Sequence, residues 1–399
     1  MISRCNLRLL RVAASAAATA LVATACMDAT APHDRVHERW YQTQLGNGYS
    51  RPVVVGNTVY FSAGDGWMIA YYAQSGVVRW RRKLGNEEIA GLNFVERKGV
   101  VVVVFLYSTI GVDAASGQEL WRYYAPPDTV LRGGSGTPGY VNWTHVAADD
   151  QTVYVPAWGA SVGASDVATG AIRWTWQFGP TVTDTAARGV FRSGSNGVAV
   201  SGDTVFATVW HGRDAALLSS DCWLVALDRS TGRELWTVAL PLLGSGVSIG
   251  SSPAFARNLV IVSTWGGYVF AIDRNSRQIA WEFRPPISYF SAAQAEVSEG
   301  VVYDDAGDGN FYALDATDGR VIWRSHVGSM STRDMLITGR RVLFSDGTSL
   351  HVLDRLTGRQ VVEVVQPRTW DSFFSSAPAY ANGQIFVTVG DAAWSFDEP

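Results

Sequence analysis

The stretch ALDRSTGRELW, residues 226–236, carries a pattern that recurs along the chain. It begins with a small residue, has Asp at its third position and Gly at its seventh, and ends with Trp at its eleventh. Asp and the Thr-Gly pair are typical of a tight turn, in which glycine tolerates a positive φ. The pattern therefore predicts a hairpin with the Trp on its returning strand.

Six further copies keep this spacing: AYYAQSGVVRW (70–80), GVDAASGQELW (111–121), ASDVATGAIRW (164–174), AIDRNSRQIAW (271–281), ALDATDGRVIW (313–323) and VLDRLTGRQVV (352–362). Three copies depart at one position each: Tyr72 replaces the Asp, Arg277 the Gly and Val362 the Trp. Two more strand-like runs lie upstream of each copy. Four short antiparallel strands per repeat are typical of a propeller blade, with the Trp packed on the next blade and the small residue leaving room for it.

The last repeat is incomplete, because the chain ends in QIFVTVGDAAWSFDEP where the next turn should begin. The missing strand is found near the N-terminus, where HERWYQTQLG (37–46) resembles VVRWRRKLG (77–85). The sequence therefore predicts an all-β, eight-bladed propeller of four-stranded antiparallel blades, closed by the N-terminal strand, which removes exposed sheet edges. A seven-bladed ring with Trp40 elsewhere is the alternative. The predicted docking tryptophans are Trp40, Trp80, Trp121, Trp174, Trp236, Trp281 and Trp323.

Composition narrows the class of protein. The chain has 399 residues, is 47% hydrophobic and only 17% charged, and contains 40 Gly and 16 Trp, which excludes a disordered chain. Its formal net charge of −4 argues against a basic nucleic-acid-binding surface. Three cysteines are too few for a disulfide framework or a Cys-rich metal site, so no metal site is expected.

The N-terminus reads as a targeting segment. Three arginines precede an apolar run over residues 12–22, which ends in Ala-Thr-Ala-Cys at residues 23–26. Small residues before a Cys resemble a bacterial lipoprotein box, which predicts that Cys26 is lipidated and becomes the first residue of the mature chain. An ordinary A-x-A cleavage with Cys26 incidental is the alternative. The predicted domains are a lipoprotein signal peptide (1–25), a tether (26–38) and the propeller (39–399).

The repeated A-x-D-x-x-T-G-x-x-x-W pattern resembles the tryptophan-docking motif of PQQ-like quinoprotein propellers, from about Trp40 to the end of the chain. One branch of these proteins contains alcohol and glucose dehydrogenases. The other is BamB, the non-catalytic lipoprotein of the outer-membrane β-barrel assembly machinery, to which a bare eight-bladed ring with a lipid anchor is similar. This resemblance implies a scaffold that binds another protein, with the assembly machinery as the candidate partner. It also implies a location on the periplasmic side of the outer membrane, or free in the periplasm or secreted if Cys26 carries no lipid.

Three loops are longer than the repeat requires: residues 125–143, 179–197 and 211–222. The alternation of strand directions places all three on one face, around the third and fourth blades. Long loops on a rigid scaffold commonly carry binding function, and aromatic residues and Arg dominate protein interfaces. Neutral insertion is the alternative. The predicted partner contacts are Tyr140, Trp143, Phe191 and Arg213.

A second candidate site is the mouth of the central channel on the same face. Aligning the repeats places one residue per blade just before each innermost strand, and most of these residues are polar. A solvated funnel is the alternative to a ligand site. The predicted channel-mouth residues are Arg51, Asn93, His145, Ser252, Gln294 and Asp334.

Two other functions stay open: a PQQ-dependent dehydrogenase and a surface propeller that binds glycans. The resemblance implies that a dehydrogenase would need Ca²⁺ beside the quinone, and the channel mouth offers one acid, Asp334, and one Asn, Asn93, at distant positions. The alcohol enzymes also carry a disulfide between adjacent cysteines, and no two cysteines are adjacent here. The sequence therefore favours a non-catalytic protein without a cofactor.

Overall fold

The structure is a computed structural model, and the compact unit treated below comprises Arg35–Pro399. The structure describes residues 36–43, 50–63, 66–85, 94–105, 108–124, 145–157, 161–179, 193–212, 220–241, 249, 251–286, 294–328, 335–346, 349–365 and 376–399.

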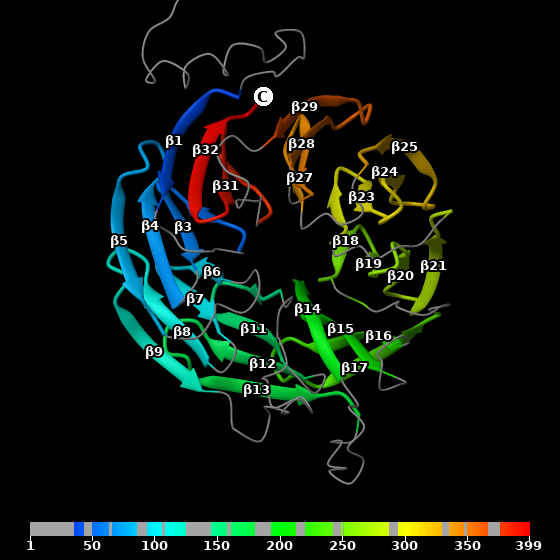
Figure 1. Cartoon of the computed structure of the whole chain (residues 1–399). Helices are drawn as coiled ribbons and strands as arrows, with labels where there is room; N and C mark the ends of the chain where they lie inside the picture. Colours follow the sequence, from blue (N-terminus) through cyan, green and yellow to red (C-terminus); the bar gives the residue numbers. More distant parts are fainter. Residues whose placement is uncertain are drawn as a thin grey trace, which may run out of the picture. The chain divides into compact units, whose positions relative to one another are not determined.

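These residues form eight antiparallel sheets of four strands each, arranged as an eight-bladed propeller (Figure 1). The predicted fold is confirmed, and the seven-bladed alternative is wrong. Figure 1 shows the first strands of the blades, such as β14 and β18, nearest the centre of the ring, and the fourth strands, such as β9 and β13, on its outside. In the described part of the chain, no helix is long and apolar enough to cross a membrane.

The first four blades follow chain order. Their strands are β2 (Val53–Val55), β3 (Thr58–Ala63), β4 (Trp67–Tyr72) and β5 (Val78–Lys83) in blade 1; β6 (Phe94–Arg97), β7 (Val100–Val104), β8 (Ser108–Asp113) and β9 (Glu119–Tyr124) in blade 2; β10 (Ala147–Ala148), β11 (Thr152–Ala157), β12 (Ser161–Asp166) and β13 (Ile172–Gln177) in blade 3; and β14 (Ser193–Ser201), β15 (Thr204–Gly212), β16 (Ser220–Asp228) and β17 (Glu234–Leu240) in blade 4.

The remaining blades follow the same order except the last, which takes its outer strand from the N-terminus. Their strands are β18 (Ala254–Ala256), β19 (Leu259–Ser263), β20 (Val269–Asp273) and β21 (Gln278–Phe283) in blade 5; β22 (Glu296–Ser298), β23 (Val301–Asp305), β24 (Asn310–Asp315) and β25 (Val321–His326) in blade 6; β26 (Met335–Ile337), β27 (Arg341–Ser345), β28 (Ser349–Asp354) and β29 (Gln360–Val365) in blade 7; and β30 (Ala379–Ala381), β31 (Gln384–Val389), β32 (Ala392–Asp397) and β1 (Glu38–Thr43) in blade 8.

Closure of the ring depends on β1, which pairs antiparallel with β32. The Arg39 guanidinium lies 2.6 Å from the Asp397 carboxylate, and the Trp40 indole N–H donates to the Ala73 carbonyl of blade 1 at 2.7 Å. The N-terminal strand thus joins the last blade by backbone pairing and the first blade by its tryptophan.

The hydrophobic core lies between neighbouring blades. All five valines of β7 are buried, whereas on the outer strand β5 only Trp80 is buried. One cluster of buried side chains, for example, joins Tyr60 and Met68 of blade 1 to Val101 and Val103 of blade 2. Cys222 is also buried, within the cluster between blades 4 and 5.

In blades 2 to 7, an Asp builds the turn that ends the third strand. Asp228 accepts hydrogen bonds from the hydroxyls and the backbone N–H groups of Ser230 and Thr231. These bonds, those from the Ser230 hydroxyl first, lower the pKa of Asp228 to about 2. Ser and Thr therefore follow the Asp because their donors complete its hydrogen bonding.

The glycine of this turn lies beneath the tryptophan of the preceding blade. A Cβ on any of the six glycines would lie 2.4 to 2.6 Å from the indole, so only glycine fits; they are Gly76, Gly117, Gly170, Gly232, Gly319 and Gly358. The indole N–H donates to a carbonyl of the same turn, as Trp281 does to Ala316 at 3.0 Å. Blade 5 departs from this rule, because its turn holds Arg277 at a φ of 60°.

Candidate functional site

Four of the predicted channel-mouth residues line one cavity of about 390 Å³, which reaches the innermost strands of blades 1 to 6. Arg51 comes from blade 1, His145 from blade 3, Ser252 from blade 5 and Gln294 from blade 6. The other two predicted residues, Asn93 and Asp334, lie outside the described residues.

Polar groups at this mouth contact one another across the ring. The Arg51 guanidinium lies 3.8 Å from the carboxylate of Glu296. The Ser252 backbone N–H donates to the Gln294 side-chain oxygen at 3.3 Å. A Cβ at Gly197 would lie 2.5 Å from the Ser252 backbone, so glycine is required where blades 4 and 5 approach.

Buried hydroxyls on the second strands fix where the next blade begins. Thr208 of β15 donates to the Ser251 carbonyl at 2.9 Å, and Ser263 of β19 accepts from the Ala295 backbone N–H at 3.0 Å. Ser251 and Ala295 are the chain neighbours of Ser252 and Gln294. These bonds therefore set the positions of two channel-mouth residues.

A buried acid lies beside these hydroxyls. Asp304 of β23 is 1% exposed, and among the described residues no well-formed hydrogen bond reaches either of its carboxylate oxygens. Removal from water raises the pKa of Asp304 well above its ordinary value, the Asp305 carboxylate adds to the rise, and the Ser263 hydroxyl opposes it. The carboxyl of Asp304 is thereby held toward its protonated form. Sequence reasoning missed this residue, since Asp304 falls in a segment that reads as a hairpin turn.

The described channel does not fit the quinone and Ca²⁺ site of a dehydrogenase. Calcium takes six to eight oxygen ligands, carboxylates prominent among them. The described residues that line the channel cavity include no Asp or Glu. Nor do three or more His, Cys, Asp or Glu side chains gather at one place within the described ranges.

The long-loop face is described only at its base. Tyr140, Trp143, Phe191, Arg213 and the predicted lipidation site Cys26 lie outside the described residues. At the roots of the second and third long loops, three half-buried aromatic rings meet. The ring centres of Phe178 and Trp223 are 4.9 Å apart, and those of Trp176 and Phe178 are 5.9 Å apart. We call these three residues the root aromatics. The sequence did not identify them as candidates, because they lie outside the eleven-residue pattern.

Comparison with known proteins agrees with this architecture. The sequence model described as outer membrane protein assembly factor BamB matches residues 29–220 and 220–388. A BamB of Burkholderia pseudomallei is 25% identical over 360 residues, which cover 87% of this chain and 83% of that protein. A BamB of Nitrosomonas eutropha is 31% identical over 173 residues, 40% of this chain. The matches cover 39% of the Nitrosomonas protein and 53% of a Moranella endobia BamB, so this chain spans about half the length of those relatives.

Solved structures with the same fold include a BamB and an enzyme. BamB of Moraxella catarrhalis superimposes with a TM-score of 0.67 at 16% identity, over 91% of this chain and all of that one. The quinohemoprotein alcohol dehydrogenase of Comamonas testosteroni gives 0.69 at 14% identity, over 91% of this chain and 76% of the enzyme. These structures support the fold alone, whereas the sequence match covers most of the propeller. The chain therefore belongs to the family described as outer membrane protein assembly factor BamB.

Proposed function

We propose that this protein is a non-catalytic scaffold that binds another protein during assembly of outer-membrane β-barrel proteins. The observation that carries the proposal is the family match, which spans both halves of the propeller rather than a few shared blades. Relatives that carry the name of the assembly factor match up to 87% of the chain. The dehydrogenase alternative rests on fold similarity at 14% identity and on a sequence match of 29% identity that covers only 34% of the chain, and the described residues lining the channel cavity include no Asp or Glu to hold calcium.

The partner would bind on the long-loop face. The root aromatics are half-buried at the described base of this face and adjoin in the chain the loops that carry Phe191 and Arg213. Tyr140 and Trp143 belong to the first long loop, residues 125–143, of the same face. Interfaces concentrate binding free energy in aromatic and Arg side chains, and rigid support lowers the entropy cost of ordering them.

A lipid on Cys26 would hold the scaffold at the membrane. Acyl chains anchor a protein without a transmembrane helix. The predicted tether of residues 26–38 would then separate the propeller from the bilayer, on the periplasmic side of the outer membrane.

Replacing Cys26 with Ser is expected to move the protein from the membrane fraction to the soluble periplasmic fraction. The reason is that the anchor supplies the membrane affinity, while the propeller surface does not. The measurement is fractionation with a carbonate wash, together with incorporation of labelled palmitate. A variant that stays in the membrane fraction and a parent chain that takes up no palmitate would both contradict lipidation at Cys26.

Four single variants, Tyr140→Ala, Trp143→Ala, Phe191→Ala and Arg213→Glu, are each expected to abolish cross-linking to the assembly machinery. Each hot-spot side chain contributes about 2 kcal/mol, or about 30-fold in affinity. The measurement is cross-linking in intact cells followed by mass spectrometry of the captured β-barrel assembly protein. The matched control is Arg359→Gln, in a turn of the opposite face. If all four variants keep the parental cross-link, the long-loop face is not the docking surface.

A further inference from the structure

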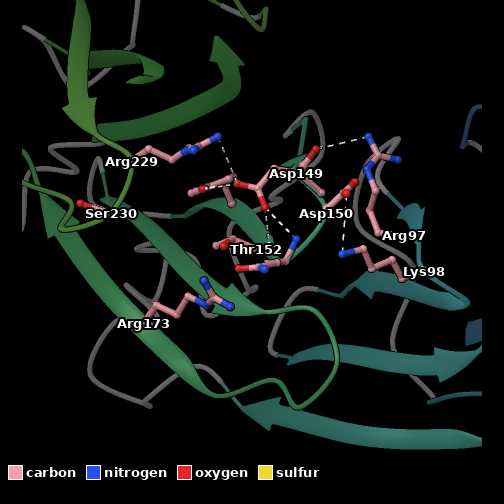
Figure 2. A pocket seen from close by; sticks show the side chains of 11 residues that line it. Arg97, Lys98, Asp149, Asp150, Thr152, Arg173, Arg229 and Ser230 are labelled. Atoms are coloured by element: carbon pink, nitrogen blue, oxygen red, sulfur yellow. Dashed lines mark hydrogen bonds and ion pairs between the residues drawn. The ribbon is translucent and has the colours of Figure 1, made fainter. Parts of the chain in front are cut away.

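A second pocket lies on the face opposite the long loops, where three blades meet. It has a volume of about 680 Å³ and is built from the turns β6–β7, β10–β11 and β16–β17 together with β13. Its lining includes four cationic side chains, Arg97, Lys98, Arg173 and Arg229, against two acids (Figure 2). We call it the interblade pocket. Its excess of positive charge contrasts with the net charge of −4 of the whole chain.

The two acids leave much of this positive charge available. Asp149 already accepts hydrogen bonds from the Gln151 and Thr152 backbone N–H groups and from the Tyr154 hydroxyl at 2.8 Å. Burial acts to raise the pKa of Asp149, but these bonds outweigh it and the pKa is lowered. Asp150 lies at the rim with 80% of its side chain exposed, 3.6 Å from Lys98.

Among the described residues, Arg97, Lys98 and Arg229 have no carboxylate closer than 3.4 Å. Arg229 lies 3.9 Å from the Asp149 carboxylate and 3.4 Å from that of Asp203, whose side chain is 96% exposed. Arg97 donates to the Ala148 carbonyl at 3.3 Å, and Lys98 reaches only the exposed Asp150. Only Arg173 forms a close ion pair, 2.7 Å from Asp166.

Equivalent arginines in two other blades are held by close contacts. Arg355 in the blade 7 turn is 9% exposed and lies 2.6 Å from Glu299 of blade 6, with a second bond to Ser298 at 3.1 Å. Arg274 in the blade 5 turn lies over the Phe206 and Phe255 rings, 5.1 and 4.7 Å from their centres. Arg229 holds the same turn position in blade 4 but is 39% exposed beside the interblade pocket.

We propose that the interblade pocket binds an acidic segment of a partner polypeptide, through carboxylates spaced along that segment. Guanidinium groups form strong charge-assisted hydrogen bonds with carboxylates. Arg229 lies on one side of the Asp149–Asp150 turn and Arg97 and Lys98 on the other (Figure 2). An extended chain with two spaced carboxylates would place one carboxylate on each side of this turn.

This site goes beyond the proposed scaffold function, because it uses turns of the opposite face and none of the long loops. Loss of acidic-peptide binding would leave cross-linking through Tyr140 and Trp143 intact. Loss of that cross-linking would leave peptide binding intact. The two proposals can therefore fail separately.

The test is fluorescence anisotropy of a fluorescein-labelled hexaglutamate peptide with the purified full-length protein, using hexaglutamine as the neutral control peptide. Hexaglutamate is expected to bind and hexaglutamine is not. Arg97→Gln and Arg229→Gln are each expected to weaken binding about fivefold, because each removes one charge-assisted contact. Arg359→Gln, the same charge change in a blade 7 turn, is expected to leave the affinity unchanged.

Thermal melting of each variant separates lost binding from lost folding, and Lys98→Gln serves if Arg229→Gln does not fold. Absence of hexaglutamate binding would overturn the proposal. An equal loss in Arg359→Gln would also overturn it, because binding would then follow the overall charge. Displacement of the peptide by an equal concentration of inorganic phosphate would show that the pocket takes single anions, which contradicts a peptide site.

Discussion

Replacing Gly319 with alanine is expected to lower the free energy of unfolding by about 3 kcal/mol. Gly319 has a φ of 74°, a conformation that costs other residues about 1–2 kcal/mol. The new Cβ would also lie 2.5 Å from the indole of Trp281, and overpacking of this kind costs about 1–3 kcal/mol. Trp281 has little room to yield, since it is 8% exposed and its N–H bonds to the Ala316 carbonyl.

Two matched variants separate the backbone cost from the packing cost. Gly300 has a φ of 78° but nothing within 4 Å of a Cβ, so Gly300→Ala is expected to cost only about 1 kcal/mol. Arg277→Gly removes the strain of an arginine held in the left-handed backbone conformation, and it is expected to raise the free energy of unfolding by up to about 1 kcal/mol. Urea unfolding followed by fluorescence and circular dichroism measures all three. If Gly319→Ala costs no more than Gly300→Ala, the contact with Trp281 does not hold the blades together.

The repeat predicted the fold well because its spacing encodes register directly. Ala226 pairs across the sheet with Trp236, and Ala70 pairs in the same way with Trp80. A small residue at that position therefore makes room for the indole within its own blade, and the turn glycine makes room in the next one. Both requirements are local, so an eleven-residue pattern records them.

Position in the repeat also predicted position on the ring. Arg51, His145, Ser252 and Gln294 line one cavity because each precedes an innermost strand at the same level. In these four blades, the residue two positions before the first strand therefore lies against the same cavity.

Contacts between blades are harder to predict from the repeat than the fold is. Arg229, Arg274 and Arg355 all follow the Asp of the repeat, yet each meets a different group on the preceding blade: a carboxylate 3.9 Å away, an aromatic ring and a close ion pair. The identity of that group is set by a turn about 55 to 80 residues upstream, as the separations of 73 and 56 residues for Arg274–Ser201 and Arg355–Glu299 illustrate. The interblade pocket depends on such long-range pairings, so no single repeat predicts it.

The sequence does not predict the burial of Asp304, for a related reason. Asp304 and Asp305 are consecutive strand residues, so their side chains point to opposite faces of blade 6. Only the packing of blade 5 determines that Asp304 is enclosed, with Ser263 as its polar neighbour. The sequence shows two acids before a turn, which is equally compatible with solvent.

Replacing Asp304 with asparagine is expected to stabilise the protein at neutral pH and to have little effect in acid. The folded-state pKa of Asp304 lies well above its ordinary value of 3.8. Below pH 3.8 the carboxyl is neutral in both the folded and unfolded states, so burial carries no ionisation cost. Above that pH the unfolded chain releases the proton more readily, and the parent protein loses about 1.4 kcal/mol per pH unit until the folded-state pKa is reached. Asparagine cannot ionise and escapes this loss.

The measurement is the free energy of unfolding in urea at several pH values between about 4 and 8, for the parent and the Asp304→Asn variant. The difference should grow with pH above 3.8 and favour the variant at neutral pH. Asp203→Asn is the control, because the Asp203 side chain is 96% exposed and its removal should leave the pH profile unchanged. A difference that does not vary with pH would show that Asp304 titrates as an exposed carboxyl. A parent more stable than the variant at neutral pH would show instead that the buried carboxylate is ionised and compensated, which reverses the sign of its contribution.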